Sequence, residues 1–249
     1  MDAITTGDQN TSIGYGAGGA NQSGAEQVNI GYQAGLACTS SGNVLIGKDA
    51  GLSITSGEAN IHIGVRAGDG YDTESHNLSI GVDALGGSVA GGEYNVAVGN
   101  FALDSLTSGD SNTCIGYNAG TAIAASQLNT FVGWEAGKTL SDTGNVNVGI
   151  GASALQVMTT GNQNTAVGGN AGYTLTTGSN NVLIGHNAGD GYDTEGNNVA
   201  VGQSSLGGPI AGGEFNVAVG NSTGAAVTSG DSNVFVGHKA GFATNSGAY

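Results

Sequence analysis

Apolar residues recur along this chain in a short alternating pattern that ends in glycine. The motif Asn-x-x-Ile/Val-Gly starts fourteen times, with Gln27 replacing Asn once, and successive starts are 16, 17 or 18 residues apart. Its second and fourth positions are apolar or Thr, whereas the third varies freely. Alternation with period two over β-branched residues predicts a strand with one buried face. We therefore expect fourth-position residues such as Val98 and Val219 to be buried, and third-position residues such as Ala97 and His62 to face solvent.

The remainder of each repeat is built from small residues and turn signals. The fifth position is always Gly, which indicates a bend that needs positive φ or close backbone approach. The eighth position is Ala in twelve repeats, with Ser205 and Thr223 as small exceptions. A second apolar residue near the twelfth position precedes a Gly-rich turn. Two short strands and two turns per repeat predict an all-β fold, a parallel β-solenoid or β-roll of fourteen rungs of ~17 residues.

Stacked rungs bring the first residue of every motif into one column. The side-chain amides of this column are expected to form a hydrogen-bonded ladder along the solenoid axis. The predicted ladder consists of Asn10, Asn43, Asn60, Asn77, Asn95, Asn112, Asn129, Asn147, Asn164, Asn181, Asn198, Asn216 and Asn233.

A longer period lies above the short one. Asn60 and Asn181 are separated by 121 residues, as are Asn77 and Asn198, and DGYDTE recurs at 69–74 and 190–195. The chain is therefore interpreted as a duplicated block of seven repeats. The predicted divisions are a lead-in at 1–9, block one at 10–128 and block two at 129–249.

The pattern N-T-x-I/V-G-Y-x-A-G/L, closed by a T-T/S-G turn, resembles the repeat arrays of phage tail-fibre proteins. Its core is also similar to the heads of trimeric autotransporter adhesins. The resemblance implies a left-handed, trimeric β-roll displayed on a virion tail fibre made in the host cytoplasm. Its implied partners are other fibre or tail proteins and a cell-surface glycan or protein receptor. A bacterial surface adhesin of the same architecture is the alternative. The small Ala and Gly positions also favour a homotrimer, because one thin rung encloses little core.

Charge narrows the classes of partner. Four Lys and Arg against 19 Asp and Glu give a formal net charge of −15. Such a chain has no basic patch for phosphates, so we expect no nucleic-acid binding. No apolar run approaches the ~18 residues of a membrane span, and the first ten residues do not resemble a secretory signal. Cys38 and Cys114 are too isolated for a disulfide framework or a zinc site.

No residues are grouped as a catalytic site requires, and we expect no enzymatic activity. The four histidines, His62, His76, His186 and His238, lie at least 14 residues apart, without a nucleophile or metal-ligand spacing. A polysaccharide depolymerase would need facing carboxylates, which an intersubunit groove could supply. An ice-binding solenoid would need an outward Thr-x-Thr array, and the second-position threonines are expected to point inward.

Two kinds of site remain as candidates. The DGYDTE turns offer oxygen ligands for Ca²⁺, or are plain acidic loops; their carboxylates are Asp69, Asp72, Glu74, Asp190, Asp193 and Glu195. The sixth position carries a row of aromatic and imidazole side chains that would stack on sugar rings or pack at a subunit interface. This row is Tyr15, Tyr32, Tyr117, Trp134, His186 and His238.

Overall fold

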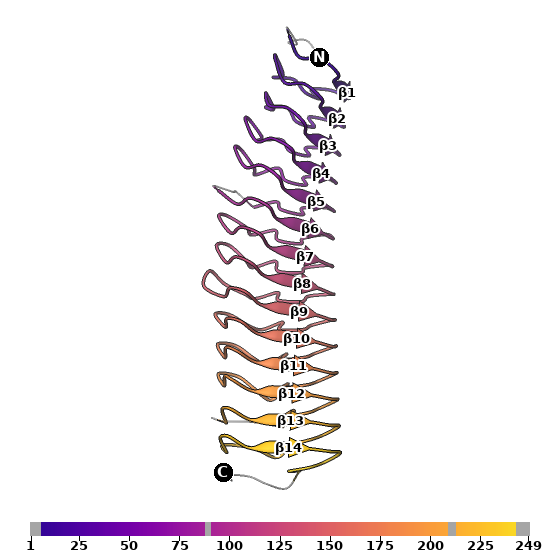
Figure 1. The fold of residues 1–249 in the computed structure, drawn as a ribbon. Coiled ribbons are helices and arrows are strands. Elements are labelled where there is room, and N and C mark those ends of the chain that lie inside the picture. The colour runs from indigo at the N-terminus through magenta and orange to yellow at the C-terminus, as the bar shows by residue number, and fades with distance from the viewer. Residues whose placement is uncertain (1–5, 88–90, 209–212, 243–249) are drawn as a thin grey trace. The chain divides into compact units, whose positions relative to one another are not determined.

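The computed structural model describes residues 6–87, 91–208 and 213–242. It divides into two compact units, residues 1–125 and 126–249. Residues 1–5 of the predicted lead-in and 243–249 of the predicted second block lie outside the described residues. Each unit is a parallel β-solenoid with one strand per repeat, which confirms the predicted fold class (Figure 1).

Each strand has three residues, at the second to fourth motif positions. The first unit contains β1 Thr11–Ile13, β2 Val28–Ile30, β3 Val44–Ile46, β4 Ile61–Ile63, β5 Leu78–Ile80, β6 Val96–Val98 and β7 Thr113–Ile115. The second unit contains β8 Thr130–Val132, β9 Val148–Ile150, β10 Thr165–Val167, β11 Val182–Ile184, β12 Val199–Val201, β13 Val217–Val219 and β14 Val234–Val236.

Strands that follow one another within a unit pair in parallel and in register. Ile61 pairs with Leu78 and His62 with Ser79, so equivalent motif positions stack directly. The invariant fifth-position glycine permits this stacking. Gly64 has φ of +144°, and a Cβ there would lie 2.2 Å from the carbonyl oxygen of Gly81 on the next rung. Any larger residue would push the rungs apart.

The prediction for the inner and outer faces of the strand is wrong. Third-position residues such as Leu45, Ala97 and Phe131 are fully buried, and so is His62. Val98 is only half-buried, and Val219 is 37% exposed. The motif asparagine explains the inversion. It points inward to bond with neighbouring rungs, and with period two the third position must then point inward as well. The outward second- and fourth-position side chains form what we call the sheet face.

The core of each rung is filled jointly from the strand and from the corner at the ninth position. A large third residue accompanies Gly at the ninth position, as with Phe131 and Gly137. Where the ninth residue is Leu, the third is small; the four such pairs are Ser79 with Leu85, Ala97 with Leu103, Gly149 with Leu155, and Ala200 with Leu206. These leucines are buried at positive φ, between 48° and 52°. Large side chains therefore occupy at most one of these two positions in a rung.

The predicted second strand of each rung is absent from the described residues. The twelfth-position side chains do point inward, and Ile54, Leu106 and Leu140 are fully buried. Their backbone nevertheless turns, because consecutive N–H groups share one carbonyl. Thr55 and Ser56 both donate to the Asp72 carbonyl, at 2.8 and 3.3 Å. An extended strand cannot make such a pair of bonds.

The asparagine column runs through each unit as a ladder of hydrogen bonds. Its main link differs from a stack of amides, because the side-chain Oδ1 atom accepts from the next backbone N–H. Asn181 N donates to Asn164 Oδ1 at 3.0 Å, and Asn164 Nδ2 donates to the Gly178 carbonyl at 2.8 Å. Nδ2–Oδ1 contacts, such as 3.1 Å from Asn181 to Asn164, are added to it. Gln27 donates its backbone N–H to Asn10 Oδ1 at 2.9 Å, but its own Oε1 accepts from Asn29 Nδ2 at 2.9 Å, so among the described residues the ladder is interrupted between Gln27 and Asn43.

Candidate recognition surfaces

The sixth-position side chains emerge directly after the glycine bend and are exposed. Tyr15 is 76% exposed and Tyr32 is 48% exposed. Their rings lie on neighbouring rungs, with centroids 5.5 Å apart and planes inclined by 15°. A stacked, solvent-facing pair of this kind offers a flat apolar surface.

The other members of the sixth-position row do not repeat this arrangement. Tyr117 packs edge-on against Phe101, with ring centroids 6.0 Å apart. Trp134 is 52% exposed and belongs to the second unit, whereas Tyr117 belongs to the first. His186 and His238 are exposed.

A second exposed row, absent from the sequence prediction, lies at the residue before the motif asparagine. His76 and Tyr94 stack there, with centroids 5.2 Å apart and planes 8° apart. Leu128, Val146 and Phe215 occupy the same position and are 47–57% exposed. All five residues have φ near +60°, a conformation that costs about 1 kcal/mol or more in non-glycine residues. The sequence signal for this row is the recurrence of large side chains immediately before the motif asparagine.

The DGYDTE turns do not gather their carboxylates into one site. Glu74 is buried and accepts from the backbone N–H groups of Asp72 at 2.9 Å, Thr73 at 3.0 Å and Gly91 at 2.9 Å. Glu195 is likewise buried and accepts from the N–H groups of Asp193 and Thr194. Among the described residues, no three His, Cys, Asp or Glu side chains converge as metal ligands. The glutamates act instead as caps of the turn.

Among the aspartates of these turns, Asp72 and Asp193 are exposed, whereas Asp69 and Asp190 are half-buried. The Asp72 carboxylate accepts a hydrogen bond from the Thr55 hydroxyl, and Asp193 accepts one from Thr176. Burial, with the nearby Asp83 carboxylate, raises the pKa of Asp69 to about 6. Burial also raises the pKa of Asp190 above its usual value, against the opposing effect of His186.

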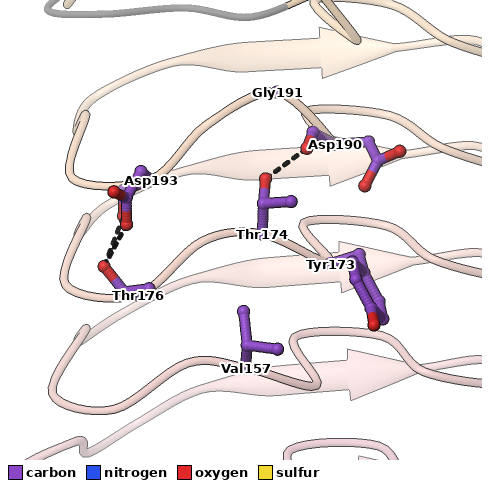
Figure 2. A pocket seen from close by; sticks show the side chains of 7 residues that line it. All are labelled: Val157, Tyr173, Thr174, Thr176, Asp190, Gly191 and Asp193. Carbon is purple, nitrogen blue, oxygen red and sulfur yellow. Dashed lines mark hydrogen bonds between the residues drawn. The ribbon is translucent and has the colours of Figure 1, made fainter.

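An open groove of about 530 Å³ lies beside the second DGYDTE turn (Figure 2). Its lining residues are Val157, Tyr173, Thr174, Thr176, Asp190, Gly191 and Asp193. Figure 2 shows the Tyr173 ring and the Asp190 carboxylate on one side of Thr174, and Thr176 with Asp193 on the other. Tyr173 is not predicted as a site residue, because it lies outside both the motif and the acidic turn.

His62, expected at the surface, is fully buried in the first unit. Its Nδ1 atom lies 2.7 Å from Ser79 Oγ, and its ring centroid is 5.5 Å from that of Tyr71. Its Nε2 atom and the Tyr71 hydroxyl have no hydrogen-bond partner among the described residues. Burial lowers the pKa of His62 to about 3, so the imidazole is neutral at pH 7. In the second block, Leu183 takes the place of His62 and Ala200 takes the place of Ser79.

The sheet face of each unit is apolar apart from its threonines. No charged residue occupies the second or fourth position of any repeat. Ile80, Ile115, Ile150 and Ile184 are 37–40% exposed, although they lie inside the sheets.

The sheet face also carries threonines, the residues that an ice-binding surface would need. The second-position threonines Thr113, Thr130 and Thr165 lie on the sheet face and do not point inward as expected. The fourth position carries only Ile or Val, so no Thr-x-Thr array results.

Comparison with protein-family models, curated proteins and solved structures finds no match. The resemblance to tail-fibre repeats therefore rests on the repeat motif. Within the described residues, no helix has the length and apolarity needed to cross a bilayer.

Proposed function

We propose that this chain is a structural and host-surface-binding segment of a phage tail fibre or a similar adhesive fibre. In this proposal three copies assemble through their sheet faces. The alternative within the same architecture is the head of a bacterial surface adhesin. The observation that carries the proposal is the uncharged, β-branched sheet face, which leaves large apolar side chains in water in a single chain.

The apolar composition of the sheet face supports the proposal that another protein surface packs against it. Monomeric proteins rarely expose contiguous apolar patches beyond a few hundred Å². Here, neighbouring strands of each unit add Val, Ile, Leu and Thr side chains to two unbroken rows. Flat rows of β-branched side chains suit face-to-face packing at about 10 Å between sheets.

Charge supports a second copy of the chain as the partner surface. Copies that each carry a net charge of −15 repel one another through most of their surface. The sheet face is free of charge, so association there avoids placing carboxylates together. Closed cyclic symmetry covers this face in every copy. Three copies is the number that the family resemblance implies.

Receptor binding is supported by the aromatic side chains beside the sheet face. Tyr15 with Tyr32, and His76 with Tyr94, form stacked exposed pairs. Rigid aromatic surfaces bind sugar rings or partner proteins at low entropic cost. Repetition in three copies would multiply weak binding through avidity.

Light scattering on the purified chain tests the assembly. We expect a mass near three times 24.1 kDa, and a mass of 24.1 kDa at micromolar concentration would contradict the proposal. The neighbouring genes distinguish the tail fibre from the bacterial surface adhesin. Virion structural genes would support the tail fibre, and genes for surface export and anchoring would support the adhesin.

A further inference from the structure

We propose that the groove beside the second DGYDTE turn binds one amino-sugar unit of a surface polysaccharide. The inference names a receptor class and a site for the proposed fibre, and so rests on that proposed function. The site is distinct from the sixth-position row, and only its two aspartates belong to the candidate calcium ligands.

The groove exists because one side chain is missing from a column. Val157, Thr174 and Gly191 occupy the same eleventh position on three successive rungs. Val157 and Thr174 fill their positions, whereas Gly191 leaves space above them (Figure 2). Thr174 is held in place, because its hydroxyl donates to the Tyr192 carbonyl at 2.6 Å. The floor is therefore preorganised.

The two sides of the groove offer complementary chemistry to a sugar. Tyr173 is 36% exposed, so part of its ring is open to the C–H face of a pyranose. Asp190, on the next rung in the same tenth-position column, has a half-buried carboxylate that no described side chain or backbone group donates to. Opposite them, the Asp193 carboxylate binds the Thr176 hydroxyl and retains a second oxygen as an acceptor. The groove thus presents acceptors for hydroxyl and ammonium donors.

Charge selects an amino sugar among the possible saccharides. Two carboxylates and no Lys or Arg line the groove. Burial of Asp190 removes water from one of these carboxylates, which strengthens its attraction for a cation. An ammonium group on the ring would meet Asp190 or Asp193 while the ring stacks on Tyr173. Uronic acids and sialic acids would be repelled.

The first copy of the turn lacks the aromatic side of the groove and provides an internal control. Asp69, Gly70 and Asp72 repeat the acidic turn, and Thr55 donates to Asp72 as Thr176 does to Asp193. Leu52, however, stands where the second copy has Tyr173. Binding that depends on Tyr173 is therefore confined to one site per chain. The groove lies at the turn side of the rungs, so assembly through the sheet face leaves it open.

Titration calorimetry on the full chain tests the site with three probes. The first is a β-1,4-linked glucosamine tetrasaccharide, the second its fully N-acetylated counterpart, and the third is putrescine. Tyr173→Ala and Asp190→Asn are compared with the matched control Leu52→Ala. Circular dichroism checks that each variant is folded, and Tyr173→Phe retains the ring if the alanine variant is unstable.

We expect one glucosamine oligomer per chain, bound about tenfold more tightly than the N-acetylated oligomer. Tyr173→Ala and Asp190→Asn should each weaken binding by about tenfold, whereas Leu52→Ala and Tyr173→Phe leave it nearly unchanged. Equal binding of putrescine, or full binding by Tyr173→Ala, would overturn the proposal in favour of plain cation attraction. Absence of glucosamine binding by a chain of trimeric mass would refute the groove and leave the fibre assembly standing.

Discussion

The ring of Phe131 occupies the space that a side chain at Gly137 would need. A Cβ built on Gly137 would lie 2.6 Å from three atoms of that ring. In the rung of β6 the sizes are reversed, with Ala97 at the third position and Leu103 at the ninth, and both are fully buried. The two positions are thus alternatives for filling one volume.

This relationship predicts strong coupling between the two positions. Gly137→Leu alone should destabilise the second unit by several kcal/mol through overpacking, and Phe131→Ala alone by about 3–5 kcal/mol through a cavity. The double variant recreates the Ala97–Leu103 arrangement. Denaturant unfolding should show a coupling free energy of about 1–3 kcal/mol toward stability. Additive losses would show that the two side chains do not share a volume.

Adjacent residues of β6 test which face is buried. Ala97→Asp places a carboxylate in a fully buried position and should reduce the free energy of unfolding by several kcal/mol. Val98→Asp places it on the sheet face, where the carboxylate of an isolated chain reaches water. Because assembly also contributes to stability, melting is measured at a dilution where both variants have the mass of one chain. A larger loss of stability for Val98→Asp than for Ala97→Asp would show that the Val98 side chain, and not that of Ala97, points into the core.

The repeat sequence predicts how the rungs stack, but not which face of each strand is buried. The repeat length, the glycine bend and the stacked asparagines follow from spacing alone, since each position has one role in every rung. The predicted orientation is wrong because β-branched residues also favour the open face of a sheet and so do not by themselves identify the core. The sequence signal for the buried face is that large residues at the third and ninth positions exclude each other, as with Phe131 and Gly137. The groove at Tyr173 could not be predicted, because it depends on which turn residues stack above one another.

Removal of one rung of the asparagine ladder should be costly. In Asn164→Ala the backbone N–H of Asn181 and the carbonyl of Gly178 both lose a buried partner. We expect a loss of about 2–4 kcal/mol in the free energy of unfolding. Asn221→Ala is the control, because Asn221 is exposed and its amide donates to the exposed side chain of Gln203. Equal effects of the two substitutions would deny the ladder a role in stability.

The buried imidazole makes the first unit sensitive to acid. The pKa of His62 is about 3 in the folded chain and about 6.5 when unfolded, so the unfolded state binds more protons between these values. The resulting stability is fully present above about pH 6.5 and is lost as pH falls toward 3. At pH 4 the loss is about 3 kcal/mol.

His62→Leu copies the residue found at Leu183 and removes this titration. Hydrogen exchange of the β4 amides, compared between pH 7 and pH 4, should show acid-induced opening in the wild type and a smaller change in His62→Leu. The β11 amides around Leu183 serve as the reference within the same chain. Equal acid responses of wild type and variant at β4 would contradict a buried, neutral His62.

Assembly through the sheet face is tested most directly by distances between copies. Cys38 and Cys114 are fully buried, so a spin label introduced at one surface cysteine in the folded protein marks one place. Val98→Cys puts the label on the sheet face, and Ser108→Cys puts it on the turn side of the same rung. We predict that dipolar spectroscopy finds the shorter distance between copies for the residue-98 label, because packed sheets lie about 10 Å apart. A shorter distance for the residue-108 label, or no coupling between copies for either label, would contradict the account.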